Sequence, residues 1–285
     1  MLHELYPQNL RHDPLAVFRE SKTPAALYAR QKWMRKKNTK EWQSDFRQVV
    51  DYLLSNQKKN GSWGDSLLVT VHRLFGLHLT IRNRTQQTER AIEWALSHDI
   101  MRQAKRAISR GSGLIHARDL SNLPFSRGCH DHVLTCSILF LASLFGYASD
   151  ERVMIAYDIL SGLNTGNKEK WCDWSCSNNF LRACIVHPVY RDSKTVKLFV
   201  AALKKVQNND GGWPAPIPFY QTVNALAHLD TNQSDDLLAQ AFLKLRRTQN
   251  RDGTWGRSQV EWNTFLIVHA IKRKGFLLQT LQGEP

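Results

Sequence analysis

Three segments of the chain read QKKNGSW (57–63), QNNDGGW (207–213) and QNRDGTW (249–255). In each, the glutamine and the tryptophan are six residues apart, a glycine lies two residues before the tryptophan, and a leucine lies four residues before the glutamine. A phrase repeated in this way indicates that one supersecondary unit is used several times along the chain. The second and third copies are separated by the length of one helical hairpin.

The segments on either side of these repeats have apolar residues at intervals of three and four, which is the period of an amphipathic helix. Clear examples are residues 46–54, 67–77 and 237–245. Strict alternation of apolar and polar residues, which would indicate strands, is almost missing from the sequence. The pattern therefore predicts an all-α chain whose helices end at turns rich in Gly, Asn and Asp.

Each repeated phrase is predicted to connect two helices. The first helix ends near the glutamine, and the second begins just after the tryptophan. The glycine permits a positive φ in the turn. The glutamine amide can satisfy a backbone group left unpaired at a helix end.

An alignment of the helices that follow the turns identifies five equivalent segments. These are residues 67–70, 132–135, 179–182, 219–222 and 261–264. Five or more helical hairpins are therefore expected in a domain of residues 41–285. Residues 1–40, which are rich in Lys and Arg and contain three prolines, are predicted to form a basic N-terminal extension packed on the outside of that domain.

The composition is that of a globular protein with a strongly basic balance. Of 285 residues, 42% are hydrophobic and 10% aromatic, which argues against wholesale disorder. The formal net charge of +14 favours polyanions, anionic lipid surfaces or phosphorylated ligands. Because the basic residues are spread over separate segments, a generally solvated basic surface is the simplest explanation. No nucleic-acid-binding module is recognisable, so nucleic acid is not an expected partner.

The N-terminal residues do not resemble a signal peptide, and the longest apolar run, residues 137–148, is too short to span a bilayer. The sequence therefore predicts a cytoplasmic protein, with peripheral attachment to an anionic membrane as an alternative. Five cysteines, at positions 129, 136, 172, 176 and 184, cluster in the middle of the chain. Free thiols or metal ligands are expected there rather than a disulfide framework.

The repeated Gln…Gly-x-Trp pattern resembles the QW motif of the terpenoid cyclase and protein prenyltransferase superfamily, which includes squalene cyclase. The resemblance covers roughly residues 41–275. It implies an α/α toroid, a barrel of five to six helical hairpins with inner and outer rings of helices and a cavity at the N-terminal ends of the inner helices. Unrelated activities share this fold, so it restricts function much less than architecture.

Most chemical signatures of that superfamily are missing from the sequence. There is no Asp-x-Asp-Asp motif, with which class II cyclases protonate an alkene or epoxide, and no Gly-Cys-Gly-Glu-Gln thioester run. The pair Asp235-Asp236 lacks the third aspartate of a magnesium-binding Asp-Asp-x-x-Asp motif, and we expect it to be a charge pair at a helix N-terminus. The larger cyclases also place their site between two helical domains, whereas this chain supplies one.

Two predicted inner helices begin with many titratable and sulfur-containing side chains, in residues 128–136 and 171–187. One hypothesis is acid catalysis. A carboxyl group buried in an aromatic cavity has a raised pKa and can act as a general acid. The candidate catalytic residues are Asp173, Asp131 and His132.

Aromatic and amide side chains near the same helix starts would contact the substrate in that hypothesis, and aromatic faces would stabilise carbocations or bind apolar chains. The candidate substrate-binding residues are Trp171, Trp174, Phe180, Tyr220, Gln221, Trp262 and Asn263. The tryptophans of the repeated turns are instead expected to be structural.

A second hypothesis is a zinc site, because sulfur and imidazole ligands suit zinc. Residues 129, 132 and 136 lie on one helical face, and residues 172 and 176 lie at i and i+4. The candidate ligands are Cys129, His132, Cys172 and Cys176.

The resemblance supports this zinc site only in part. Compared with protein prenyltransferases, Cys129 lies near their zinc-binding Cys, but Gln221 stands at their His position and Arg127 at their Asp position. Compared with lanthionine cyclase-like toroids, Cys129-His130 and Cys172 occur in reversed order.

A purely structural role accounts for the same residues, since cysteine is often a small buried residue and aspartates often cap helices. The sequence thus leaves three functions open. The leading one is a toroid that binds an isoprenoid or another apolar ligand in a central cavity and transforms or cyclises it by acid-initiated chemistry. The alternatives are a zinc-thiolate enzyme and a non-catalytic repeat scaffold with a basic exterior.

Overall fold

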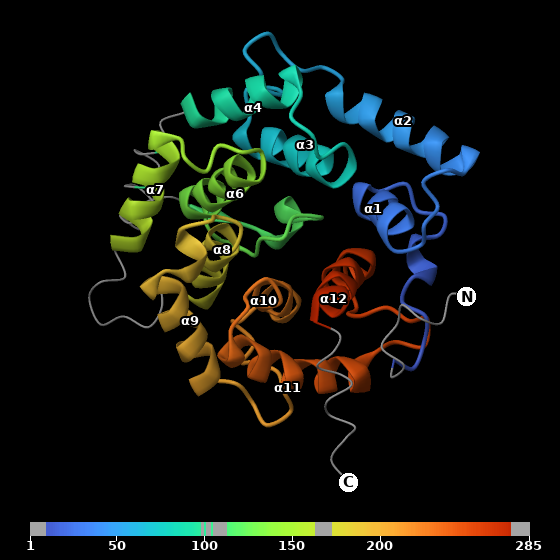
Figure 1. The fold of residues 1–285 in the computed structure, drawn as a ribbon, viewed down its shortest axis with the longest axis vertical. Coiled ribbons are helices and arrows are strands. Elements are labelled where there is room, and N and C mark those ends of the chain that lie inside the picture. Colours follow the sequence, from blue (N-terminus) through green and yellow to red (C-terminus); the bar gives the residue numbers. More distant parts are fainter. Residues whose placement is uncertain (1–9, 98–99, 101–103, 105–112, 163–172, 275–285) are drawn as a thin grey trace.

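The computed structural model describes residues 10–97, 100, 104, 113–162 and 173–274. Its helices form two concentric rings, and successive helices alternate between them (Figure 1). The inner ring contains α1 (Pro24–Lys32), α3 (Leu67–Thr80), α6 (His130–Leu144), α8 (Trp174–Cys184), α10 (Phe219–Leu226) and α12 (Val260–Lys274). The outer ring contains α2 (Lys40–Leu54), α4 (Gln86–Ser97), α7 (Glu151–Gly162), α9 (Lys194–Lys205) and α11 (Asn232–Thr248). This arrangement confirms the predicted all-α toroid.

The remaining elements are short. Among the described residues, the 3₁₀ helix η2 (Ala16–Phe18) precedes α1, and the 3₁₀ helices η3 (Ala117–Leu120) and η4 (Tyr190–Asp192) lie in connections between longer helices. The strands β1 (Leu114–Ile115) and β2 (Gly128–Cys129) pair antiparallel just before α6. The segment between these strands projects into the middle of the ring (Figure 1).

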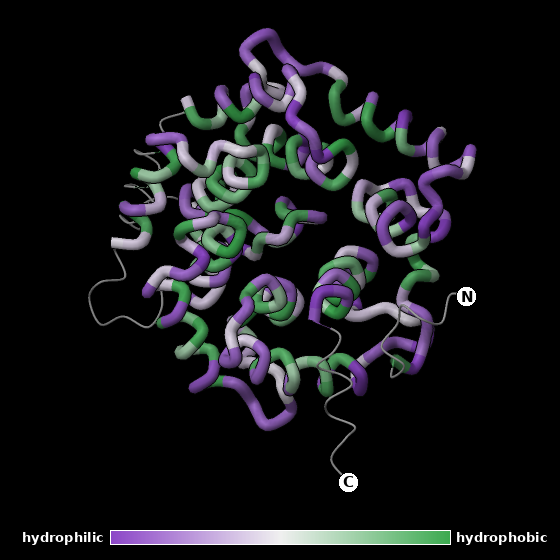
Figure 2. Tube along the Cα trace, in the orientation of Figure 1, coloured by the Kyte–Doolittle hydropathy of each residue, from purple (hydrophilic) through white to green (hydrophobic). Residues whose placement is uncertain are grey.

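Local sequence signals explain where the helices begin. Thr23, Thr39, Ser66 and Ser193 each accept a hydrogen bond at the N-terminus of the helix that follows, and Pro24 occupies a favoured position in the first turn of α1. Hydrophobic residues follow the inner ring and the inward faces of the outer helices (Figure 2). Helix α6 is the extreme case, because every residue from 132 to 142 is buried. The apolar core therefore lies between the rings and around the ring centre.

The three repeated turns have the same hydrogen bonds. Each tryptophan donates its indole N–H to a carbonyl near the end of the preceding outer helix, over 2.9 Å from Trp63, 3.1 Å from Trp213 and 2.8 Å from Trp255. Each glutamine donates its amide to the carbonyl of the turn glycine and to a second carbonyl further along the ring. The predicted structural role of these tryptophans and glutamines agrees with this geometry.

The glycines of these turns are required by space as well as by conformation. Gly61, Gly211 and Gly253 have φ values of 96°, 85° and 86°. A Cβ atom on any of them would lie 2.2 Å or less from a backbone oxygen of the neighbouring outer segment. The turn can therefore approach its neighbour closely only with glycine.

The third turn closes the ring against the N-terminal segment. The Gln249 amide donates to the His12 carbonyl over 2.9 Å, and the backbone N–H groups of Arg11 and His12 donate to the Gln249 carbonyl oxygen. In the first two turns the corresponding glutamine amide bonds to the next outer helix, α4 or α11. Residues near His12 therefore occupy the place that an outer helix takes elsewhere.

Helix α1 corrects the expected position of the N-terminal residues. It lies within residues 1–40, which were predicted to pack on the outside, yet it contacts both α3 and α12 as a member of the inner ring (Figure 1). Its residues Ala26, Leu27 and Ala29 are buried. No repeated turn precedes α1 in the sequence. The sequence pattern therefore does not indicate that the apolar face of α1 packs between α3 and α12, where the two ends of the ring meet.

Candidate functional site

The candidate acid Asp173 lies at the N-terminus of α8, where it caps the helix. Its Oδ1 atom accepts a hydrogen bond from the Cys176 backbone N–H over 2.6 Å, and the residue is exposed. This is the usual role of an aspartate at an N-cap position. Helix capping, the structural role that the sequence also allows for this aspartate, therefore accounts for these contacts.

His132, the second candidate catalytic residue, is a buried histidine between α6 and α8. Its Nε2 atom lies 2.9 Å from the Cys176 carbonyl oxygen and 3.5 Å from the Cys136 sulfur. Burial lowers its pKa from 6.5 to about 4, despite the opposing effects of the Cys176 carbonyl and of Asp173. His132 is therefore neutral near pH 7, and its ring joins two inner helices.

Asp131, the third candidate, lies in the first turn of α6. Its Oδ1 atom is 3.2 Å from the Nδ1 atom of His130, and 22% of its side chain is exposed. Unlike Asp173, it is not used as the N-cap of its helix, because Cys129 occupies that position. Asp131 is the candidate carboxyl group whose side chain pairs with a neighbouring imidazole.

The predicted zinc ligands are not all within the described structure. Cys129 lies in β2 and Cys176 is buried in α8, whereas Cys172 lies outside the described residues. Among the residues that are described, no three His, Cys, Asp or Glu side chains are placed to hold a metal ion. Burial also raises the pKa of the Cys136 and Cys184 thiols well above the ordinary value. The zinc site remains a prediction.

The predicted substrate-binding residues separate into two groups. Trp174 packs on Phe199 of α9, with ring centroids 6.0 Å apart, and Phe180 packs near Tyr157 of α7, at 6.3 Å. Both rings thus contact residues of outer helices, and their predicted role in substrate binding stays a prediction. Trp171 lies outside the described residues.

Three other members of the predicted set have contacts of different kinds: Asn263 and Tyr220 contact residues close in sequence, and Gln221 takes part through its backbone carbonyl. Asn263 donates to the Ser258 carbonyl over 2.9 Å, and the Gln221 carbonyl accepts from Arg182 over 3.0 Å. The Tyr220 ring lies edge-on to Phe219 at 5.5 Å. These three residues belong to the N-terminal parts of α10 and α12, as predicted.

Trp262 of α12 packs between α3 and the segment that joins β1 and β2. Its indole N–H donates to the Leu123 carbonyl over 2.9 Å, which fixes the segment between β1 and β2 against α12. Its ring stacks on Phe265 at 5.2 Å and lies edge-on to Phe75 of α3 at 5.8 Å. Phe75 in turn contacts Phe140 of α6 at 6.2 Å. We call these rings, together with Trp33 and Phe125, the aromatic centre.

A second set of side chains converges beyond the aromatic centre, towards the C-terminal ends of the inner helices. It comprises His78, Arg82, Arg182, His228, His269 and Arg273, which come from α3, α8, α12 and the end of α10; we call it the basic end. The imidazoles of His228 and His269 stack at 5.2 Å, and Tyr28 of α1 lies 6.0 Å from His269. Side chains from five inner helices can meet in this way only inside the ring.

The three histidines of the basic end are deep in the protein yet retain accessible surface. Burial lowers the pKa of His78 and of His269 from 6.5 to about 4 and that of His228 well below its ordinary value, with further lowering by neighbouring arginines. Each ring nevertheless has intermediate exposure. The three imidazoles are therefore largely surrounded by protein but keep some accessible surface.

Several buried nitrogen atoms of the basic end have no hydrogen-bond partner within the described structure. They are the Nη2 atom of Arg82, the Nε atom of Arg182 and the Nδ1 atom of His269. Arg182 is 2% exposed, and burial lowers its pKa to about 9. Buried polar atoms are usually paired, so three unpaired ones in a single cluster require an explanation, and the two guanidinium nitrogens among them are donors.

Sequence reasoning missed the basic end because its members are scattered over 196 positions, from residue 78 to residue 273. The signal that could have found it is the inward face of α12, on which Trp262, Phe265, His269 and Arg273 recur at helical spacing. An aromatic face that ends in His and Arg indicates an apolar interior with a polar end.

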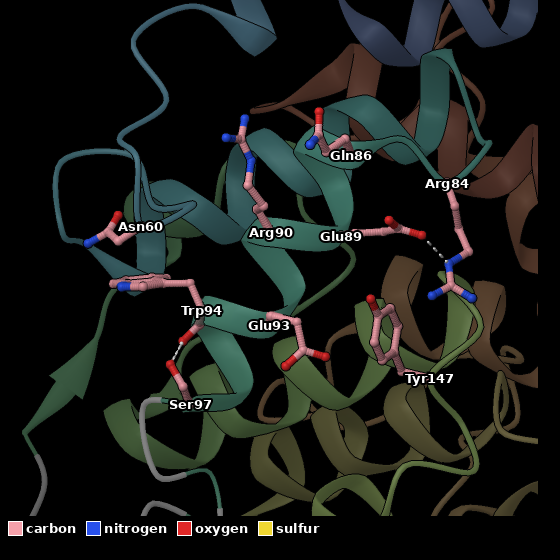
Figure 3. Close-up of a pocket in the computed structure, with 9 residues that line it drawn as sticks. All are labelled: Asn60, Arg84, Gln86, Glu89, Arg90, Glu93, Trp94, Ser97 and Tyr147. Carbon is pink, nitrogen blue, oxygen red and sulfur yellow. Dashed lines mark hydrogen bonds and ion pairs between the residues drawn. The ribbon is translucent and has the colours of Figure 1, made fainter.

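A surface pocket of about 650 Å³ lies elsewhere, over the outer helix α4 (Figure 3). It is lined by residues such as Asn60, Arg90, Trp94 and Tyr147, and Arg84 forms an ion pair with Glu89 there. The pocket contains none of the predicted site residues. Its mixture of paired charges indicates no particular chemistry.

Among solved structures, the chain is similar to a variant of the type II terpene cyclase MstE from Scytonema in complex with its substrate, geranylgeranyl dihydroxybenzoate. The TM-score is 0.52 at 12% sequence identity, and the match covers 92% of this chain and 87% of that chain. The two chains therefore have similar lengths. This likeness shows that the fold is terpenoid cyclase-like.

The sequence matches no protein-family model and no curated protein. Within the described residues, no helix has both the length and the apolar character needed to cross a membrane.

Proposed function

Because the fold is terpenoid cyclase-like, we propose that this chain binds an isoprenoid or similarly apolar molecule inside its ring and cyclises it by acid-initiated chemistry. The observation that carries the proposal is the aromatic centre. Phe75, Phe140 and Trp262 come from three different inner helices, and the Phe75 ring contacts both of the others. Their faces suit both the binding of a hydrocarbon chain and the stabilisation of a carbocation.

The size of the chain is compatible with this function. The larger cyclases use two helical domains, but the match to MstE extends over most of both chains. MstE was captured with a geranylgeranyl substrate. This similarity in length supports a cyclase function for a chain of this size, and we infer that a prenylated molecule is the substrate class here too.

Asp131 is the carboxyl group that we assign as the acid. Its O–H bond would break as the proton adds to one carbon of a double bond, and the π electrons would form the new C–H bond. The neighbouring carbon becomes a cation, which a second double bond attacks to close the ring. Loss of a proton to the Asp131 carboxylate would end the reaction.

Two observations favour Asp131 over Asp173. Asp173 already accepts the capping hydrogen bond of α8, and protonation of its carboxylate would weaken that bond. The Asp131 side chain instead contacts the imidazole of His130, a group that can return a proton to it.

Catalysis is tested by incubating the purified protein with geranylgeranyl dihydroxybenzoate, geranylgeranyl diphosphate and farnesyl diphosphate. A cyclised isomer of unchanged mass is expected from at least one of them, detected by liquid chromatography and mass spectrometry. Asp131→Asn should abolish that product, whereas Asp173→Asn should retain it. The absence of any isomer would contradict the catalytic part of the proposal.

Binding is tested separately with geranylgeraniol, by quenching of tryptophan fluorescence. Phe75→Leu should weaken binding, because it removes a ring of the aromatic centre. Phe199→Leu is a matched control, since Phe199 is equally buried but lies on the outer helix α9. Equal weakening by both variants, or no binding to the wild type, would contradict a prenyl site inside the ring.

A further inference from the structure

We propose that the basic end binds the phosphate or diphosphate head group of the ligand. The proposal of an anion site depends only on the geometry of the basic end. The placement of the attached prenyl chain against the aromatic centre rests on the proposed function.

The donors of the basic end suit a phosphate group. Arg82, Arg182 and Arg273 approach from three different helices, and all three charges act on the same imidazole, His269. A guanidinium group binds two phosphate oxygens through paired N–H donors. Three guanidinium groups from different parts of the ring therefore offer more donors than a single pair of oxygens can accept from. A diphosphate offers enough oxygen atoms to engage this number of donors.

The unpaired donors point to a missing acceptor. Two of the Arg182 nitrogens already donate, Nη1 to Asn224 over 2.7 Å and Nη2 to the Gln221 carbonyl, but Nε has no partner in the described structure. The Arg82 guanidinium lies 4.2 Å above the Tyr28 ring, and its Nη2 is likewise unpaired. A buried cation without a full set of acceptors is costly, so an anion at this position would stabilise the fold as well as bind.

The groups that face His269 are basic or neutral. They are Tyr28 from α1, His78 and Arg82 from α3, Arg182 from α8, His228 from the end of α10, and Arg273 from its own helix. The described carboxylate in contact with this set, Asp230, is 65% exposed and pairs with Arg273 and Arg191 at the rim. The interior of the basic end therefore offers an anion a site without a resident competitor among the described residues.

The negative partial charges at the helix C-termini provide an alternative explanation for basic residues at this end. That effect accounts for Lys272, Arg273 and Lys274 in the last turn of α12. It does not account for three accessible imidazoles held neutral inside the ring, or for donors left unpaired. An anion accounts for both, since it would accept from the donors and favour protonated histidines.

The backbone at Arg82 provides the means to test this site. Arg82 follows the end of α3 with a φ of 59°, a left-handed conformation usually taken by Gly or Asn at this position. Arg82→Asn therefore removes the guanidinium while keeping a residue that fits the backbone. Arg251→Asn is the matched control, because Arg251 is exposed in the third repeated turn and the second turn already has Asn209 at the same place.

The site also fixes the direction of the chain. A carbocation beside three arginines would be repelled, so the reacting double bonds must lie away from the basic end. The head group at the C-terminal ends of the inner helices therefore directs the prenyl chain past Trp262 towards the end where Asp131 lies.

Isothermal titration with inorganic diphosphate, geranylgeranyl diphosphate, geranylgeranoic acid and geranylgeraniol tests the site. The wild type should bind inorganic diphosphate, and Arg82→Asn should weaken this by about tenfold or more, as expected for a lost charge-assisted bond. Arg251→Asn should leave it unchanged. Titrations in buffers of different ionisation enthalpy should show protons taken up on binding, because the histidines begin neutral.

The four probes separate this proposal from the function of the ring. Binding of geranylgeraniol without any advantage for the diphosphate would overturn the anion site and leave the prenyl site intact. If inorganic diphosphate binds and geranylgeraniol does not, the anion site is supported and the prenyl site is overturned. If geranylgeranoic acid binds as tightly as geranylgeranyl diphosphate, the preference for phosphate is wrong. Melting temperatures of both variants show that the fold is retained.

Discussion

The two ends of the inner ring differ in how their polar side chains are paired. At the N-terminal ends, Asp173 caps α8, His132 bonds to the Cys176 carbonyl, and Asn179 both accepts from and donates to the backbone of Ser126. At the C-terminal ends, buried nitrogen atoms of Arg82, Arg182 and His269 have no partner in the described structure. The Oδ1 atom of Asn178 in α8 has no partner there either, but it is an acceptor. The unpaired guanidinium donors of Arg82 and Arg182 lie at the C-terminal ends, where they leave hydrogen-bonding capacity for an anion.

The same comparison separates local from non-local information. The polar residues of the N-terminal end lie in two short sequence segments, 128–136 and 171–187, which makes them conspicuous, and their hydrogen bonds form within α8 or between its residues and those at or shortly before the start of α6. The residues of the basic end come from separate helices and meet only when the ring closes. Asp173 and His132, which belong to the more conspicuous cluster, thus have contacts that a structural role explains, whereas Asp131 keeps its proposed role as the acid.

Trp262, which lies between the two ends, should give the largest effect on stability. Trp262→Ala removes a ring that is 1% exposed and the hydrogen bond to Leu123, and should cost about 3–5 kcal/mol in the free energy of unfolding. Trp262→Phe should cost clearly less. Denaturant unfolding measures both, and a cost below about 1 kcal/mol for the alanine variant would show that the aromatic centre is loosely packed.

The buried histidines should make the protein sensitive to acid. A pKa of about 4 in the folded state and 6.5 in the unfolded state means that the unfolded chain binds more protons between these values. Stability should therefore be complete above about pH 6.5 and fall as the pH drops towards 4. For the fully buried His132 the loss is about 2 kcal/mol at pH 5, and it is smaller for the partly accessible His269.

The two ends can be distinguished within this pH dependence. His132→Asn and His269→Asn should each flatten the curve of unfolding free energy between pH 7 and pH 5. Saturating inorganic diphosphate should remove the part due to His269 and leave the part due to His132. A curve that diphosphate does not alter would contradict the difference between the ends.

Asp173 should behave as a helix cap. Asp173→Ala should cost about 1 kcal/mol, because it leaves the Cys176 N–H without its acceptor, and Asp173→Asn should cost little. Thermal unfolding measures the two variants. A large loss of catalytic activity in Asp173→Asn, with unchanged stability, would transfer the acid role from Asp131 to Asp173.

Arg82→Asn should give the smallest change in stability, and in the opposite direction. Asn fits the left-handed backbone better than Arg and removes an incompletely paired charge, so the ligand-free protein should gain up to about 1 kcal/mol. The same variant should lose the stabilisation that diphosphate gives to the wild type. A destabilised ligand-free variant would indicate that Arg82 holds the ring together.

The toroid could be predicted because the residues that define each repeated turn lie close together in the sequence. Gln207, Gly211 and Trp213 make their defining contacts within one hairpin and with the next outer helix, so a short phrase predicts them. The five aligned segments all lie in inner helices for the same reason.

What could not be predicted depends on contacts between distant residues. The inner position of α1 results from its packing on α3 and α12, and the orientations of Trp174 and Phe180 depend on which ring each face meets. Predicting the basic end would require both the packing of distant helices and the orientation of their side chains. Helical period identifies an apolar face, but only the closed ring determines what that face meets.

The most direct test of a prenyl site inside the ring is photocrosslinking with a geranylgeranyl diphosphate that carries a diazirine near the far end of its chain. Mass spectrometry of the labelled peptides then locates the chain. We predict labelling of peptides that contain Phe75, Phe140 or Trp262, in competition with unlabelled geranylgeraniol. Labelling of the outer helix α4 around the surface pocket, with the inner helices unmodified, would contradict the account.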